Sequence, residues 1–219
     1  LYSLLDVAKP VLRSFCLEVF NVKHIKSGFH FLTSILGRLT KLQSFTVVAK
    51  RGVPLAVKGL KAFTKGLFNN LANGGGVCRL NFIGTAILNV SEGFDKFKDA
   101  LLKTPTLKVL SFENNPMTVS PIGRYFGTFL ANHRGLEELN LINCSLVQES
   151  SKEIADGLMR AKDLQILRLN QNSSMYYEGL SSILYSLAFS PRIRLIEARN
   201  CYMSGSANQL KEALFKLLK

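Results

Sequence analysis

A spacing of apolar residues recurs along this chain of 219 residues. It is clearest in LEELNLINCSL, which begins at Leu136, and in LQILRLNQN, which begins at Leu164, because both stretches carry leucine at positions 1, 4 and 6. The template LxxLxLxx(N/C)xL finds further copies that begin at Leu12, Leu42, Val77, Leu107 and Ile193. Successive copies start 28 to 35 residues apart. Repetition at a nearly fixed period constrains the fold more strongly than any single segment does.

Each copy has two halves with different periodicities. Positions 4 and 6 alternate with other residues, as in a short strand with one buried face. Apolar residues in the second half follow helical spacing, for example Ile154, Ala155, Leu158 and Met159 in residues 147–162. Because one strand and one helix cannot bury their apolar faces alone, consecutive units must stack. We expect strands near residues 14–17, 44–47, 79–82, 109–112, 138–141, 166–169 and 195–198, and helices that include 119–132, 147–162 and 207–219.

One connection between units is longer than the others. The surplus lies in NNLANGGG, residues 69–76. Three consecutive glycines just before a strand predict an irregular helix-to-strand connection over this stretch. A phosphate-binding loop would instead follow a strand, open a helix and end in GK[ST], and this stretch has none of these features.

The units resemble the leucine-rich repeats of the ribonuclease-inhibitor-like class, which combine LxxLxLxx(N/C)xL strands with helices. Position 9 carries Asn115, Cys144, Asn172 and Cys201 in the last four copies. That alternation resembles the paired repeat types of the family, whose side chain at this position turns inward and satisfies backbone groups. An Asn amide does this well, whereas a Cys mostly fills space. The first three copies depart from the pattern, so their turns must be satisfied differently; they have Phe20, Lys50 and Thr85 there.

The resemblance implies an α/β leucine-rich repeat solenoid. Its shape would be a curved horseshoe, with a parallel sheet on the concave side and helices on the convex side. We expect a single domain of about seven repeats over residues 1–219. Because the chain opens on Leu1 in the middle of a unit, we expect it to be a fragment of a longer protein.

The sequence predicts no catalytic residue, metal site or cofactor. It contains neither GxSxG nor HExxH, and its three histidines lack metal-ligand spacing. Four isolated cysteines favour reduced, mostly buried thiols and an intracellular, cytoplasmic location. No apolar run of 18 residues is free of charge, so we expect no membrane span.

Charged residues between the strand leucines are the candidate binding residues. The resemblance implies that ligands contact positions 2, 3, 5, 7 and 8 on the concave face. Acidic Glu137 and Glu138 precede basic Arg168, Arg194 and Arg199, which predicts a charge step that orients a protein partner. The alternative is an ordinary solvated sheet face. The predicted contact residues are Glu113, Glu137, Glu138, Arg168, Arg194, Glu197 and Arg199.

The net charge of +13 is concentrated in the N-terminal third, where residues 1–75 carry +9. Lys58, Lys61 and Lys65 are three and four residues apart, so they share one helical face. We therefore weigh two functions: a non-enzymatic scaffold that binds a protein, and a subunit of a ribonucleoprotein or other large assembly held by this basic flank through nucleic acid. The alternative is that these three lysines form an ordinary solvent-exposed helix face that binds nothing.

Overall fold

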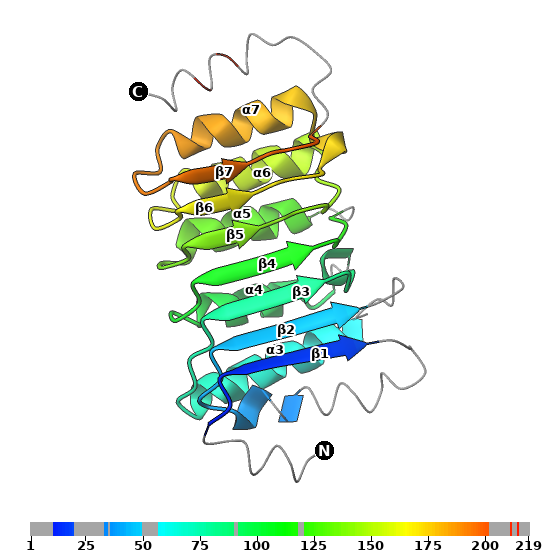
Figure 1. The fold of residues 1–219 in the computed structure, drawn as a ribbon, viewed down its shortest axis with the longest axis vertical. Helices are drawn as coiled ribbons and strands as arrows, with labels where there is room; N and C mark the ends of the chain where they lie inside the picture. Colours follow the sequence, from blue (N-terminus) through cyan, green and yellow to red (C-terminus); the bar gives the residue numbers. More distant parts are fainter. Residues whose placement is uncertain are drawn as a thin grey trace.

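The computed structural model of the chain describes residues 11–19, 33–34, 36–49, 57–89, 92–117, 121–201, 211 and 214. In these ranges seven strands form one sheet in chain order, and each strand pairs in parallel with the next (Figure 1). Every expected strand is present, with its ends within two residues of the expected positions. The strands are β1 (Ser14–Val19), β2 (Ser44–Ala49), β3 (Arg79–Ile83), β4 (Val109–Glu113), β5 (Glu138–Asn140), β6 (Ile166–Arg168) and β7 (Leu195–Glu197).

The helices all lie on one face of the sheet (Figure 1). In the described part of the chain, no helix covers the other face, which we call the open face. This layering confirms an α/β fold with a parallel sheet. The expected helix over residues 207–219 lies outside the described residues except for Lys211 and Leu214. The helices are α3 (Val57–Ala72), α4 (Phe94–Leu102), α5 (Ile122–Asn132), α6 (Gln148–Leu158) and α7 (Tyr176–Leu187), with short 3-10 turns η3 (Ile87–Asn89) and η4 (Ser173–Met175).

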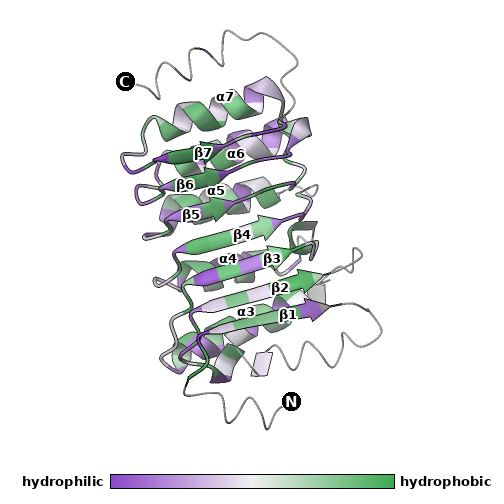
Figure 2. Cartoon of the chain, viewed as in Figure 1, coloured by the Kyte–Doolittle hydropathy of each residue, from purple (hydrophilic) through white to green (hydrophobic). Residues whose placement is uncertain are grey.

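Strand register stacks the template positions into columns. Position 4 of each copy faces position 4 of the next, so Leu80, Leu110 and Leu139 are consecutive partners. Position 6 forms a second column through Val47, Phe82 and Phe112, and Figure 2 shows the alternation of these apolar residues with polar ones along β3. The predicted core is confirmed, because these residues are all 0% exposed: Leu110, Phe112, Leu139, Leu141, Leu167 and Leu169.

The turn after each strand places a residue in the left-handed backbone region. Position 8 has a positive φ in five consecutive copies, at Gly84, Asn114, Asn143, Gln171 and Asn200, with values between 52° and 63°. Gly and Asn tolerate this conformation best, which explains their frequency at this position. The bend directs the following residue, at position 9, into the interior.

The side chains at position 9 hydrogen-bond the turn of the preceding unit. The Asn172 amide donates to the carbonyls of Leu141 (2.8 Å) and Leu169 (2.7 Å), and its oxygen accepts from the backbone N–H of Cys144 (2.9 Å). Asn115, two units earlier, makes a similar set: its amide donates to the carbonyls of Phe82 and Glu113, and its oxygen accepts from the Thr85 hydroxyl and the Ile87 backbone N–H. Cys, expected mostly to fill space at this position, also makes a hydrogen bond, because the Cys201 thiol donates to the carbonyl of Leu169 at 3.2 Å.

The glycine-rich connection is shorter than its composition suggests. The expected connection over residues 69–76 was wrong in its first half, because α3 continues to Ala72. Asn70 is fully buried, and its amide donates to the carbonyls of Leu36 (2.7 Å) and Leu39 (3.1 Å). These bonds hold a polar residue inside the helix layer, so the chain leaves the helix only before Gly74, whose φ is +76°.

Helices α5 and α6 approach each other unusually closely. A Cβ atom added at Gly127 would lie 2.1 Å from the carbonyl oxygen of Glu153, and one added at Gly157 would lie 2.2 Å from that of Gly127. Only glycine leaves room for this contact between the two backbones. The close packing fixes the spacing of the helix layer behind β5 and β6. In the described ranges, no helix has the length and apolar character needed to cross a membrane.

Candidate functional site

Residues at positions 3, 5 and 7 of the template place their side chains on the open face. Equivalent positions of successive units form rows across the strands. Position 5 forms the central row, in which Ser111, Asn140, Arg168 and Glu197 follow one another across β4 to β7. Because side chains alternate along a strand, this row points away from the buried columns at positions 4 and 6. The charges in this row are confined to the last two strands.

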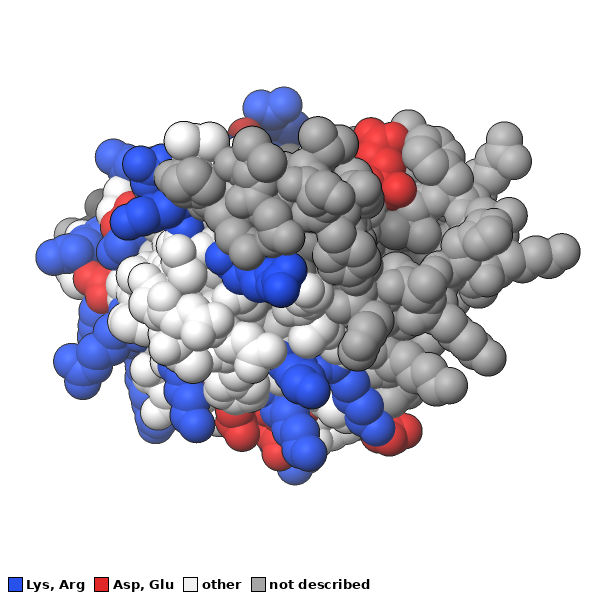
Figure 3. Space-filling model, turned by 90° about the horizontal axis from the view of Figure 1, so that it is seen from below, with Lys and Arg blue, Asp and Glu red and all other residues white. Residues whose placement is uncertain are grey.

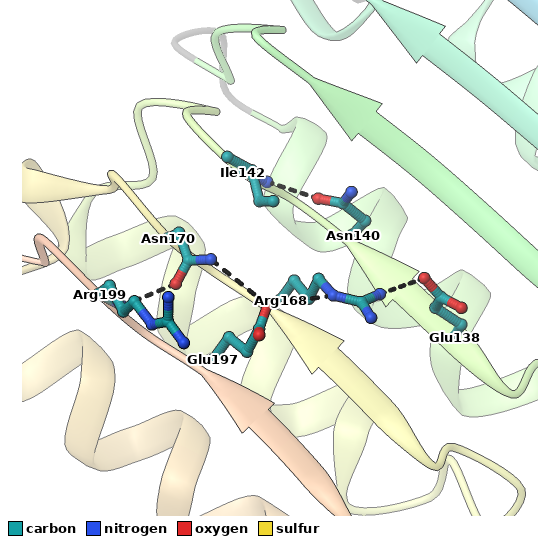
Figure 4. Close-up of polar contacts among 7 residues, drawn as sticks. All are labelled: Glu138, Asn140, Ile142, Arg168, Asn170, Glu197 and Arg199. Atoms are coloured by element: carbon teal, nitrogen blue, oxygen red, sulfur yellow. Dashed lines mark hydrogen bonds and ion pairs between the residues drawn. The ribbon is translucent and has the colours of Figure 1, made fainter.

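Arg168 is at the centre of a network of ion pairs and hydrogen bonds on the open face (Figure 4). Its guanidinium contacts the carboxylate of Glu138 on β5, and its Nε lies 3.1 Å from Oε2 of Glu197 on β7. The three side chains are only 20% to 26% exposed. Such partial burial, with a partner on each side, restricts the arginine to one orientation.

The side-chain amide of Asn170 extends this network toward the carboxyl ends of the strands, and the amide of Asn140 beside it bonds the backbone (Figure 4). The side-chain amide of Asn170 reaches Oε2 of Glu197 at 3.5 Å, and its oxygen accepts from the backbone N–H of Arg199 at 2.7 Å. The Asn140 oxygen accepts from the backbone N–H of Ile142 at 3.0 Å. The amides therefore hold the backbone beside the ion pairs, and the Arg199 side chain is left exposed.

The structure separates the two residues of the predicted acidic pair, Glu137 and Glu138. Glu138 is a strand residue on the open face, whereas Glu137 precedes the strand and pairs with Lys108 at 3.0 Å, each of these two side chains being 44% exposed. Alternation along the chain directs the two carboxylates to opposite sides. Each has a basic partner from a neighbouring unit, so the predicted charge step between an acidic and a basic spot is not present in that form.

The remaining predicted contact residues border the network. Glu113 ends β4 at position 7 of the open face. Arg194 directly precedes β7 and is exposed, and alternation along the chain directs its side chain away from the side that Leu195 and Glu197 share. The structure thus brings together Glu138, Arg168, Glu197 and Arg199, and it leaves Glu137 and Arg194 outside this group.

Apolar side chains on the open face were missed by a search for charged residues. Ile166 and Leu195 are register partners at position 3, beside the ion pairs, and Leu195 is 38% exposed. Ile142 and Ile83 are partly exposed at position 7. Strict alternation along each strand would have identified them, because side chains at positions 3, 5 and 7 face the opposite side of the sheet from the buried side chains at positions 4 and 6.

The basic flank lies in the helix layer, away from the open face. Lys61 pairs with Glu92 at 2.6 Å, Lys65 is exposed, and the side chain of Lys58 is outside the described residues. Figure 3 views the N-terminal end of the molecule, where Lys and Arg cover more of the described surface than Asp and Glu do. The predicted excess of positive charge at this end is therefore visible on the surface.

Burial suppresses the reactivity of the inner thiols. It raises the pKa of the Cys144 thiol to about 12 and raises the pKa of Cys201 as well, so both are protonated at neutral pH and poor nucleophiles. Burial also lowers the pKa of His133, whose Nε2 lies 3.1 Å from the carbonyl of Thr104. Across the described ranges, no three His, Cys, Asp or Glu residues are grouped so as to hold a metal ion.

Comparison with known proteins gives no family for this chain: no protein-family model matches it, and no curated protein matches it either. A functional proposal therefore depends on the side chains of the open face and of the helix layer.

Proposed function

We propose that this chain is a leucine-rich repeat solenoid of the ribonuclease-inhibitor-like class and a non-enzymatic scaffold that binds a protein partner on the open face of its sheet. Three features support the class. The strands follow chain order at intervals close to the repeat length, position 8 adopts a left-handed conformation, and position 9 bonds to the preceding turn. Stacked units create an extended surface, which is where such proteins bind partners.

The observation that carries the binding proposal is the fixed Glu138–Arg168–Glu197 network beside exposed apolar side chains. Arginine is enriched among the few residues that dominate the binding energy of protein interfaces. Here the arginine is already held between two carboxylates, so little side-chain entropy remains to be lost on binding. Ile166 and Leu195 supply apolar area next to it.

Mixed charge on this face favours a protein over a nucleic acid. A surface that follows a phosphate backbone needs consecutive positive side chains. The network instead interleaves two carboxylates with one guanidinium across three strands. Interleaved charges fix the register of a partner that carries the complementary pattern.

Site-specific photo-crosslinking tests the location of the partner. We would place a photo-reactive amino acid at Asn140 on the open face and, as the control, at Thr128 on the exposed side of α5, then identify the crosslinked protein by mass spectrometry. The proposal expects one discrete product from position 140 and none from position 128. Equal products from both positions, or a product from position 128 alone, would contradict it.

A network inversion then tests which side chains bind. The triple variant Glu138→Lys/Arg168→Glu/Glu197→Lys keeps opposite charges beside one another and so retains cross-strand pairing, while it reverses every sign that the partner meets. By calorimetric titration with the identified partner, we expect binding to weaken by about a hundredfold with a nearly unchanged melting temperature. Unchanged affinity in a folded triple variant would exclude this network from the interface.

A further inference from the structure

A groove between α3 and α4 combines positive charge with an apolar floor. It has a volume of about 510 Å³. Lys61 and Lys65 line it from α3, Gly93 and Lys96 line it from the start of α4, and the ring of Phe68 contributes to its floor. We call this hollow the α3–α4 groove. It lies on the helix layer and is distinct from the open face.

Its lysines differ in how far their charge is already neutralised. Lys61 bonds to Glu92 at 2.6 Å. Within the part of the chain that the structure describes, Lys65 and Lys96 have no carboxylate partner. A further ammonium group, that of Lys103, lies 5.4 Å from the centre of the Phe68 ring. Three ammonium groups and one carboxylate therefore line the groove, and Lys103 is not among its lining residues.

The floor of the groove offers little for specific polar recognition. Phe68 is partly exposed and packs against the hydrophobic core. The hydroxyl of Thr64 is directed to the carbonyl of Leu60 at 2.8 Å and is buried, so it is not available to a ligand. An occupant would gain from an apolar side chain on the floor and from negative charge at the rim.

We propose that the α3–α4 groove docks an acidic segment of a partner protein, with an apolar side chain against Phe68 and carboxylates on Lys65 and Lys96. The Lys61–Glu92 pair shows that a carboxylate fits at the rim of this groove within hydrogen-bond distance of an ammonium group. Charge complementarity and the apolar floor together select a peptide that carries both features.

Two observations favour an acidic peptide over RNA. The carboxylate of Glu92 lines the groove between its lysines, and negative charge there opposes a phosphate backbone. Among the described residues that line the groove, Phe68 is the one aromatic side chain, whereas single-stranded nucleic acids are bound by several aromatic rings on which successive bases stack.

Fluorescence anisotropy with labelled probes tests the proposal on the whole chain. The peptide EDELFDEE carries acidic and apolar residues, QNQLFNQQ removes the charge, EDESSDEE removes the apolar anchor, and an oligouridine of about 12 nucleotides represents RNA. The test variant is Lys65→Glu/Lys96→Glu. The matched control is Lys152→Glu/Arg160→Glu, which changes the net charge equally at exposed positions on and beside α6. Thermal melting of both variants establishes that they remain folded.

We expect EDELFDEE to bind more tightly than the other probes, and Lys65→Glu/Lys96→Glu to weaken this binding by about tenfold. The control variant should change it by less than about twofold, because only long-range charge is altered. Three outcomes would overturn the proposal: no binding of EDELFDEE, equal weakening in both variants, or tighter binding of oligouridine that Lys65→Glu/Lys96→Glu abolishes. The last result would identify a nucleic-acid surface. The open-face proposal is independent of all three.

Discussion

Replacing Asn172 tests the idea that position 9 holds the turns together. The side chain is fully buried, and it makes bonds of 2.7 to 3.2 Å to two carbonyls and two backbone N–H groups. Asn172→Ala leaves three of these groups buried without a partner, because the Leu169 carbonyl keeps its hydrogen bond from the Cys201 thiol. Each such group costs about 1–3 kcal/mol, and relaxation of the turn recovers part of this. We therefore expect the free energy of unfolding to fall by about 3–5 kcal/mol.

Asn172→Cys provides an intermediate case that the chain itself suggests. The thiols of Cys144 and Cys201 donate to the same type of carbonyl, at position 6 of the preceding unit. A thiol at position 172 should keep the bond to the Leu141 carbonyl and lose the two that accept from N–H groups. The loss of stability should thus be about two thirds of that in Asn172→Ala.

Urea denaturation measures this series, with Asn132→Ala as the control because Asn132 is exposed and bonds only within its own helix. The control should cost less than about 0.5 kcal/mol. Native-state hydrogen exchange adds a local readout: the amides of Cys144 and Leu146, which donate to Asn172, should exchange faster in both variants. A loss below about 1 kcal/mol in Asn172→Ala, or unchanged exchange at these amides, would refute the assigned role.

Three further perturbations test the core, the helix contact and a buried histidine. Leu139→Ala should lower the free energy of unfolding by about 2–5 kcal/mol in urea denaturation, because it opens a cavity in a fully buried column; melting like the wild type would show that the column is not core. Gly127→Ala should destabilise by about 1–3 kcal/mol although alanine favours helices, since its Cβ would meet the Glu153 carbonyl, whereas Thr128→Ala beside it should have little effect; a stabilised Gly127→Ala would disprove the close contact. Burial lowers the pKa of His133 in the folded state from its ordinary value of 6.5. The stability that the neutral, buried imidazole contributes is therefore fully present above pH 6.5, and it is lost as the pH falls from 6.5 through the lower pKa of the folded state. His133→Gln should reduce the loss of stability measured by urea denaturation between neutral and acidic pH, and an unchanged pH dependence would argue against this assignment.

The strands and the core columns were predictable because their signal is local and repeated. Alternation identifies the buried face of each strand, and stacking then places equivalent positions beside one another, as Leu139 lies between Leu110 and Leu167. An error of one residue in any copy would expose its leucines, so the pattern also determines the register.

The helical residues at 69–72 were not predictable in the same way, because the information is not local. NNLANGGG has the composition of a loop. Its first half is helical because the Asn70 amide donates hydrogen bonds to two carbonyls that lie more than thirty residues earlier in the chain. The polar residue is stable there only because those carbonyls lie opposite it after folding.

The candidate site was predicted in its residue types and not in its pairing. Arg168 and Glu197 were identified as facing residues, but Glu137 and Glu138 were treated as one spot although successive side chains leave a strand on opposite sides. The partners of Arg168 come from units before and after it. Such pairs depend on the register and on the reach of long side chains, which periodicity alone does not determine.

The two proposed binding surfaces lie on opposite layers and in different halves of the sheet. The α3–α4 groove belongs to the helix layer behind the N-terminal strands, whereas the Glu138–Arg168–Glu197 network faces the other way on β5 to β7 (Figure 1). Partners on these surfaces would not compete for space. A continuous, tightly packed core connects the two regions, and such a core resists deformation. With partners on both surfaces, the chain would therefore hold them in a fixed relative arrangement. The binding energy of one partner would be nearly independent of whether the other is bound.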